Sequence, residues 1–230
     1  MGCINHAFAG SGFLWNAANG QIRPGRQDTT REDGSMANEL RGRRIAFMTA
    51  NEGIKQVELA EPWQAVLDAG GTPELLCPEE GKAQAFNHLD KADIFPVDHA
   101  ISDADPAHYD GLVLPGGVAN PDQLRTVRAA VQFVQAMFES GKPAAAICHG
   151  PWTLVEADLV RDRTLTSWPR LQTDIRNAGG AWVDAGVQVC TSGPNVLITS
   201  RNPGDLRFLP AAGRGVPAEV VSGPPPAGLG

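Results

Sequence analysis

The stretch that decides the fold is residues 143–157, Pro-Ala-Ala-Ala-Ile-Cys-His-Gly-Pro-Trp-Thr-Leu-Val-Glu-Ala. Its first five residues form a short apolar run that is typical of a buried strand, and Thr153 to Ala157 are expected to lie in a helix. Cys148 lies at the junction, so the stretch predicts a strand, a sharp turn and a helix. A turn of this kind exposes a nucleophile above the edge of the sheet and directs the following backbone N–H groups toward it.

The same alternation of elements extends outward over most of the chain. Apolar runs predict strands at 44–50, 73–77, 111–114, 143–147, 187–190 and 196–199, and apolar residues at helical spacing predict helices at 57–67, 127–140 and 171–178. Glycines follow these helices, as expected for helix ends. The pattern predicts an α/β fold with a doubly wound, mostly parallel sheet and helices on both faces.

The two ends of the chain depart from this pattern. Residues 1–40 are rich in Gly, Asn, Arg and Asp without a sustained period, and residues 210–230 are rich in Pro and Gly. Such compositions predict a disordered extension and a disordered tail around one domain at 41–209. No apolar run is long enough to cross a bilayer, and the first 36 residues lack the features of a signal peptide.

Charge and cysteine usage restrict the partners and the compartment. The 230 residues carry a formal net charge of −7, which argues against nucleic acid as a main partner. The four cysteines are widely spaced and form neither a disulfide framework nor a Cys-x-x-Cys pair, so free thiols and a cytoplasmic location are expected. No cofactor is expected, and no metal, because no further ligands follow Cys148 and His149 at suitable spacing.

Two segments carry the candidate chemistry. The start of a helix favours negative charge and should lower the pKa of the Cys148 thiol, which favours a nucleophile over a structural cysteine. The turn Pro115-Gly116-Gly117 follows the strand 111–114 and should lie at the same sheet edge. Glycines there let backbone N–H groups approach a substrate oxygen, so an oxyanion site is favoured over a plain turn. The predicted oxyanion and substrate-binding residues are Gly116, Gly117, Gly150 and Trp152, although core packing of Trp152 is an equal alternative.

These segments make the chain resemble the PfpI family, within the class I glutamine amidotransferase-like superfamily, from about Leu40 to Leu206. The resemblance rests on Thr49-Ala50-Asn51-Glu52, Val57-Glu58-Leu59, Leu114-Pro115-Gly116-Gly117, Asn120-Pro121-Asp122, Ala146-Ile147-Cys148-His149-Gly150-Pro151-Trp152 and Thr199-Ser200-Arg201-Asn202-Pro203. It implies a flavodoxin-like fold and a catalytic set in which Cys148 is the nucleophile and His149 the general base. Asp122 matches an acid that a neighbouring subunit often contributes, and Glu58 matches a buried glutamate that contacts the sulfur.

Two physical expectations accompany this catalytic set. The side chains of adjacent Cys148 and His149 are expected to diverge at the turn, so His149 needs an orienting group from another segment, for which Asp122 is the candidate. A carboxyl of Glu58 held by burial would stay protonated and donate to the thiolate. The alternative for Glu58 is an exposed acid at the start of a helix.

The resemblance implies a cysteine-dependent hydrolase in stress defence. Its substrates would be small carbonyls or glycated adducts, as in glyoxalase III and protein deglycases, or else peptides. The protein is expected to form a homodimer or a higher homo-oligomer, to bind no membrane, and to meet nucleic acid only as a glycated substrate. Two alternatives stay open: a redox-sensing stress protein or chaperone in which Cys148 is oxidised without turnover, and a binding module with an inactive site.

Overall fold

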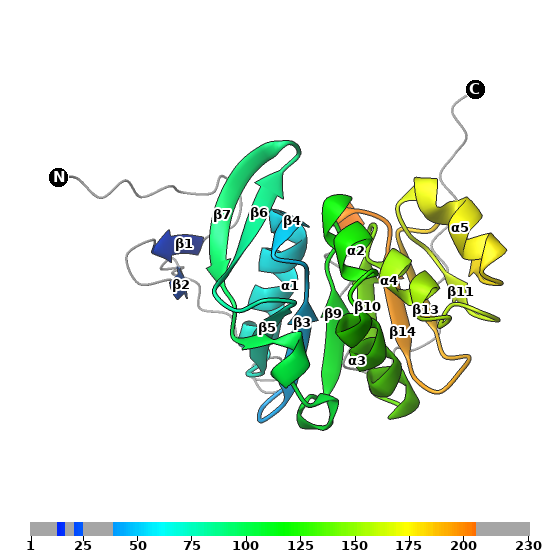
Figure 1. Ribbon diagram of the computed structural model, residues 1–230, viewed down its shortest axis with the longest axis horizontal. Coiled ribbons are helices and arrows are strands. Elements are labelled where there is room, and N and C mark those ends of the chain that lie inside the picture. Colours follow the sequence, from blue (N-terminus) through cyan, green and yellow to red (C-terminus); the bar gives the residue numbers. More distant parts are fainter. Residues whose placement is uncertain (1–12, 17–20, 25–38, 206–230) are drawn as a thin grey trace, which may run out of the picture. The chain divides into compact units, whose positions relative to one another are not determined.

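The computed structural model describes residues 13–16, 21–24 and 39–205, and the chain divides into two compact units, Met1–Ser35 and Met36–Gly230 (Figure 1). In the first unit, β1 (Phe13–Asn16) and β2 (Gln21–Pro24) form an antiparallel pair. Apart from this pair and residues 39–40, the expected extension lies outside the described residues, and so does the expected tail over 210–230.

The second unit is built on a seven-stranded sheet. Its strands are β3 (Arg44–Met48), β5 (Thr72–Cys77), β8 (His99–Ala100), β9 (Gly111–Leu114), β10 (Ala144–Ile147), β13 (Val187–Cys190) and β14 (Leu197–Ser200). The spatial order is β13-β14-β10-β9-β3-β5-β8, and every neighbouring pair is parallel except β13–β14. This arrangement confirms the expected mostly parallel sheet.

Helices cover both faces of the sheet. They are α1 (Gln56–Asp68), α2 (Ala119–Leu124), α3 (Arg128–Glu139), α4 (Pro151–Glu156) and α5 (Gln172–Asn177), with short 3₁₀ turns at Ile101–Asp103, Pro106–His108 and Pro169–Leu171. Side chains alternate across β3, so Ala46 and Met48 join the core cluster of α3, α4 and α5, while Ile45 and Phe47 join that of α1. The two clusters confirm the doubly wound arrangement.

Several short elements were not anticipated, α2 among them. The strands β4 (Glu52–Lys55), β6 (Lys82–Asn87) and β7 (Asp90–Pro96) form a second sheet, whose β6–β7 pair curves away from the main one (Figure 1). The strands β11 (Thr164–Leu165) and β12 (Ala181–Trp182) pair in parallel. The β6–β7 segment escapes detection because its buried positions are small, as at Ala83 and Ala85, and because its turn uses His88 at φ 58° instead of a glycine.

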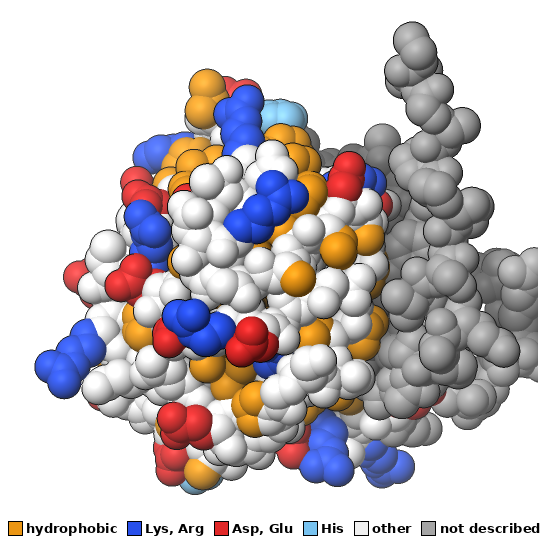
Figure 2. Space-filling view, turned by 90° about the vertical axis from the view of Figure 1, so that its right-hand side faces the viewer, with side chains coloured by type: hydrophobic (Ala, Val, Ile, Leu, Met, Phe, Trp, Pro, Cys, Tyr) orange, Lys and Arg blue, Asp and Glu red, His pale blue; other side chains and the backbone are white. Residues whose placement is uncertain are grey.

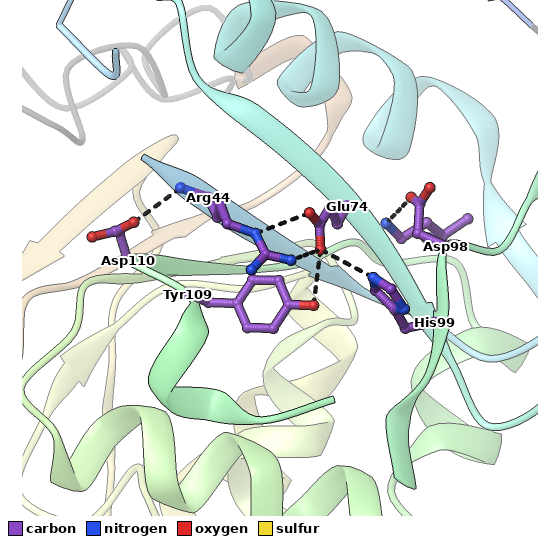
Figure 3. Close-up of polar contacts among 7 residues, drawn as sticks. Arg44, Glu74, Asp98, His99, Tyr109 and Asp110 are labelled. Atoms are coloured by element: carbon purple, nitrogen blue, oxygen red, sulfur yellow. Dashed lines mark hydrogen bonds and ion pairs between the residues drawn. The ribbon is translucent and has the colours of Figure 1, made fainter. Parts of the chain in front are cut away.

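A polar network connects the strands at the end of the sheet where β3 and β9 begin (Figure 3). The Arg44 guanidinium donates two hydrogen bonds to the Glu74 carboxylate, at 3.0 and 2.8 Å, and lies 5.1 Å from the centre of the Tyr109 ring. The Tyr109 hydroxyl donates to the same carboxylate at 3.0 Å, and the backbone N–H of Arg44 donates to Asp110 at 2.9 Å. The network thus joins the start of β3 to β5 and to the segment that enters β9.

Within the described part of the chain, no helix is long and apolar enough to cross a membrane. Figure 2 shows acidic and basic side chains interspersed over the face that it presents. This mixture provides no single-sign field on that face for steering a highly charged partner.

Candidate active site

Cys148 occupies the turn between β10 and α4, as the sequence predicts. Its φ of 57° lies in the left-handed region that only a few per cent of non-glycine residues adopt. The turn is held on both sides: the Cys148 N–H donates to the Ser200 carbonyl, and the Cys148 carbonyl accepts from the Trp168 N–H, each at 2.8 Å. A Cβ on Gly150 would collide with the Leu114 carbonyl oxygen, so only glycine fits after His149.

The thiol and the neighbouring imidazole point into the same site. Cys148 Sγ lies 3.2 Å from His149 Nδ1, so the expectation that these two side chains diverge is wrong. The left-handed conformation of Cys148 is the physical reason, because it turns the backbone enough to bring consecutive side chains together. The His149 ring stacks on Trp168, with centroids 5.9 Å apart and planes 25° apart, and its centroid lies 5.9 Å from that of Trp152. Two indoles therefore orient the imidazole.

His149 is suited to accept a proton from the thiol. Burial lowers the pKa of His149 to about 4, with smaller contributions from the Arg170 and Lys55 charges. The imidazole is therefore neutral at pH 7. With its proton on Nε2, the Nδ1 atom is free to accept the Sγ proton across 3.2 Å.

Glu58 lies fully buried beside the thiol, in the first turn of α1. Its Oε2 atom accepts a hydrogen bond from the Gly116 N–H at 2.9 Å, while Oε1 is buried without a hydrogen-bond partner among the described residues. Burial raises the pKa of Glu58 to about 7, and its interaction with the Cys148 thiol only partly opposes this shift. The structure thus places Glu58 as the buried acid that the resemblance implies, and excludes an exposed helix acid.

The Cys148 thiol is buried next to the Glu58 carboxyl, and both the burial and the carboxyl affect the pKa of the thiol. Burial raises the pKa of the Cys148 thiol, and the charge of ionised Glu58 raises it further. The expected lowering by the helix start is therefore wrong, because the His149 N–H and the Lys55 charge oppose the rise only weakly. Since two adjacent buried groups cannot both ionise easily, the pair carries at most one negative charge at neutral pH.

The Pro-Gly-Gly turn shapes the site but does not offer all of its N–H groups to a substrate. A Cβ on Gly116 would collide with Glu58 Oε2 and lie 2.7 Å from the Ile147 carbonyl oxygen. The Gly116 N–H is donated to Glu58, and the Gly150 N–H to the Ile147 carbonyl at 2.7 Å. This corrects the expected oxyanion role of these two glycines. The Gly117 N–H lowers the pKa of Glu58, whereas the His149 N–H lies near the sulfur.

Asp122 lies apart from His149 within one chain. Its side chain is 57% exposed and pairs with Arg125 at 3.3 Å, and no hydrogen bond or ion pair joins it to His149 in the part of the chain that is described. Arg125 lies 5.0 Å from the Trp152 ring centre, and Trp152 Nε1 donates to Asp174 at 2.7 Å. Trp152 thus lies beside both His149 and the Asp122–Arg125 pair, in a half-buried position.

Sequence reasoning missed several residues around the site. Lys55 and Arg170 act on the site through their charges, and Asn120 holds the Pro-Gly-Gly turn by donating to the Pro115 and Gly116 carbonyls at 2.8 and 3.0 Å. Asn120 is the first residue of the Asn120-Pro121-Asp122 motif, so the sequence motif could have identified it as a residue of the site. The described residues contain no group of three His, Cys, Asp or Glu side chains arranged to hold a metal.

Comparison with known proteins places this geometry in a family. A model described as the DJ-1/PfpI family matches residues 43–210. The chain belongs to the DJ-1/PfpI family. Among the relatives of this DJ-1/PfpI protein, a deglycase of Pyrococcus horikoshii is 37% identical over 71% of the chain and 92% of the relative. General stress protein 18 of Bacillus subtilis is also 37% identical, over 72% of the chain and 92% of the relative.

Solved structures agree with this assignment. A two-domain protein of Anabaena variabilis, containing DJ-1/ThiJ/PfpI-like and ferritin-like domains, aligns with a TM-score of 0.67 and 30% identity. The alignment covers 77% of the present chain and 50% of the Anabaena chain. The DJ-1 of Schizosaccharomyces pombe aligns with a TM-score of 0.62 at 18% identity, covering 76% of this chain and 93% of the other, which supports the shared fold.

The buried Glu58 carboxyl should make the unfolding free energy of the protein depend on pH. Its pKa is about 7 in the folded protein and near 4.5 in the unfolded chain, so the folded state binds the additional proton between these values. The stabilisation is full below pH 4.5 and is lost as the pH rises through 7. The unfolding free energy of the native protein, relative to Glu58→Gln, should fall by up to about 3 kcal/mol over this range.

Urea unfolding of both proteins at pH 5 and pH 8 measures this difference. His149 titrates in both proteins, so its contribution cancels to first order. A difference that stays constant from pH 5 to pH 8 would show that Glu58 does not hold its proton in the folded state.

Proposed function

We propose that this protein is a Cys148-dependent enzyme that acts on small dicarbonyls, such as methylglyoxal, or on the adducts that they form with proteins. The observation that carries the proposal is the position of the Cys148 thiol, 3.2 Å from a neutral, buried imidazole. The left-handed turn that places the thiol there is stabilised by backbone hydrogen bonds to Ser200 and Trp168. A nucleophile beside a base that is itself held in position is the usual arrangement for covalent catalysis.

The names of the relatives support an enzyme of this type. Those of Pyrococcus horikoshii, Thermococcus kodakarensis and Pyrococcus furiosus are named deglycases, one of Bacillus subtilis carries a cysteine protease name, and one of Escherichia coli is named a protein/nucleic acid deglycase. We favour a carbonyl substrate over a peptide because the nucleophile is only 5% exposed, which suits a small molecule better than an extended chain.

The proposed reaction begins with addition of the thiol to the aldehyde. The Cys148 sulfur forms a bond to the aldehyde carbon while His149 Nδ1 takes the thiol proton and returns it to the carbonyl oxygen, giving a hemithioacetal. Removal of the proton on that carbon gives an enediol. A proton then returns to the adjacent carbon, and the hydroxyl proton passes from the first oxygen to the second, so that the adduct becomes a thioester with a neighbouring hydroxyl group. Water then cleaves the thioester, releases a 2-hydroxy acid and restores the thiol, so that dicarbonyl and water are consumed in equal amounts.

Glu58 determines when the thiolate can form. An ionised Glu58 opposes a negative charge on the sulfur, whereas the protonated acid is able to donate to it. In this proposal the carboxyl keeps its proton while the sulfur carries charge. The His149 N–H beside the sulfur is the backbone donor best placed for the developing oxyanion.

A redox-sensing role for Cys148 has less support than catalysis. Sensor cysteines are usually solvent-accessible and have a lowered pKa. Burial and Glu58 raise the pKa of Cys148, so its thiolate is scarce until a base removes the proton. This requirement favours a role in which His149 and a bound substrate act together.

A steady-state assay of the purified protein with methylglyoxal, in buffer without added thiols, tests the proposal. Formation of a 2-hydroxy acid that depends on Cys148 is expected. Absence of turnover with dicarbonyls, together with cleavage of peptides by Cys148, would transfer the assignment to the peptidase class.

We further propose that the active form is an oligomer in which Asp122 of one subunit approaches His149 of another. Asp122 is exposed on α2 and paired only with Arg125 among the described residues, so its carboxylate is available to a second chain. The Trp152 ring contacts both the Arg125 guanidinium and the His149 ring, so the Asp122–Arg125 pair is linked to the site within each chain through this indole. A carboxylate on the imidazole would stabilise its protonated form during the reaction.

Mixing two inactive variants tests this shared site. If Asp122 acts across the interface, a mixed dimer of Cys148→Ser and Asp122→Ala holds one site with both lesions and one with neither. Up to about a quarter of the native rate should return after exchange of subunits, because half of the dimers are mixed and each has one intact site. No recovery, with mixed assemblies verified by native mass spectrometry, would show that Asp122 acts within its own chain or not at all.

A further inference from the structure

Lys55 and Arg170 carry two positive charges beside the site that the proposed reaction does not use. Lys55 is half-buried and Arg170 is exposed. Within the described ranges neither side chain forms an ion pair with a carboxylate, unlike several of the other arginines, Arg125 among them. A cation without a carboxylate partner near a reactive thiol is available to a bound anion.

The backbone places Lys55 beside the Pro-Gly-Gly turn. The residue ends β4 and immediately precedes α1, and its N–H donates to the Gly116 carbonyl at 3.5 Å. A Cβ on Gly117 would lie 2.9 Å from the Lys55 nitrogen. Glu58 follows three residues later, so Lys55 and Glu58 are neighbours on one side of the helix start. The Lys55 charge accordingly acts on both the Glu58 carboxyl and the Cys148 thiol.

Arg170 is held near the site by the 3₁₀ turn Pro169–Leu171. This turn directly follows Trp168, whose N–H donates to the Cys148 carbonyl at 2.8 Å and whose ring stacks on His149. Arg170 therefore lies two residues from a direct contact with the thiol and the imidazole, and its charge acts on His149. Two segments far apart in the sequence thus each bring one cation to the same site.

The carboxyl groups that touch residues of the site do not neutralise both cations. Glu58 has a pKa of about 7 and is largely protonated at pH 6. Asp122 is paired with Arg125, and Asp174 accepts a hydrogen bond from the Trp152 indole. The two unpaired cations therefore face one remaining carboxylate, and the excess positive charge attracts an anion to the site.

We propose that Lys55 and Arg170 form an anion-binding subsite beside Cys148, which favours small carbonyl substrates that carry a carboxylate. This inference rests on the proposed function and specifies its substrate class. The carboxylate would bind to the two cations while the aldehyde carbon faces the sulfur. Methylglyoxal, which is neutral, would react without using the subsite. Adducts that keep a positive charge, such as those of some lysine and arginine side chains, would be disfavoured by repulsion.

The relative rates at which iodoacetate and iodoacetamide alkylate Cys148 test the subsite. The two reagents react alike and are similar in size, but only iodoacetate carries a carboxylate. At pH 6 and low salt, the ratio of the iodoacetate rate to the iodoacetamide rate should be at least about 10-fold higher for Cys148 than for the free thiol mercaptoethanol. Lys55→Gln and Arg170→Gln should each lower the ratio by about threefold or more. Lys91→Gln, the matched control, changes an exposed lysine on β7 and should leave the ratio unchanged.

A ratio for Cys148 equal to that of mercaptoethanol, or one that both substitutions leave unchanged, would overturn the proposal. If a variant does not fold, the salt dependence of the ratio in the native protein decides the question. Screening should lower the ratio by about threefold or more between roughly 0.01 M and 1 M salt, and a constant ratio rejects the subsite. Alkylation requires no turnover, so a raised ratio in a protein that converts no dicarbonyl would refute the proposed function and support the subsite.

Discussion

Serine at position 148 should lower kcat/KM for methylglyoxal by at least about 1000-fold, in line with the loss of other catalytic nucleophiles. A hydroxyl holds its proton more tightly than a thiol and is the poorer nucleophile, so His149 should activate serine far less than it activates cysteine. The substitution removes little volume, so the turn between β10 and α4 should persist. The measurement is the steady-state rate of both proteins in thiol-free buffer.

The matched control for this substitution is Cys190→Ser, which changes an equally buried thiol outside the site. Its kcat/KM should stay within about twofold of the native value, as expected for a residue that does not contact the substrate. Retention of more than a tenth of the native kcat/KM by Cys148→Ser would mean that the thiol is not the nucleophile.

Alanine at position 149 should lower kcat/KM by about 100-fold or more, the usual contribution of a general base. In the native protein the rate should fall as the pH decreases through about 4, because protonated His149 no longer accepts the thiol proton. An unperturbed histidine would give this loss near pH 6.5. The pH dependence of kcat/KM, from pH 3.5 to pH 8, measures the midpoint.

Two further variants separate proton transfer from packing. His149→Phe keeps an aromatic ring beside Trp152 and Trp168 and should be as inactive as alanine. His99→Ala changes a half-exposed histidine on β8 and should retain the native rate and acid limb. Recovery of activity in His149→Phe would show that the ring serves only to fill space.

The sequence was sufficient to predict six of the seven strands of the main sheet, all but β8, and the turn that holds Cys148. The short apolar runs 45–48 and 111–114 favour buried strands, and the elbow around Cys148 follows from a strand that runs into Cys-His-Gly. Glu58 could be located from its motif, and its burial follows from its place on the inner side of the first turn of α1. At these positions the local sequence preferences and the overall fold favour the same structure.

Other features depend on tertiary contacts that a single sequence does not contain. The convergence of Cys148 and His149 results from a left-handed backbone that the Ser200 and Trp168 contacts stabilise. The raised pKa of Cys148 results from burial beside Glu58, which outweighs the helix start. The second sheet is polar, with small buried residues in β6, and therefore lacks the apolar period that marks a strand.

Alkylation of the Cys190→Ser protein by limiting iodoacetamide tests the central claim most directly, because it relates activity to the state of one sulfur. The modified fraction of Cys148, from peptide mass mapping, and the residual turnover of methylglyoxal are measured in the same samples, with and without substrate during alkylation. Residual activity should equal the unmodified fraction of Cys148, and the substrate should slow both losses equally. Turnover that survives complete alkylation of Cys148 would contradict its assignment as the nucleophile.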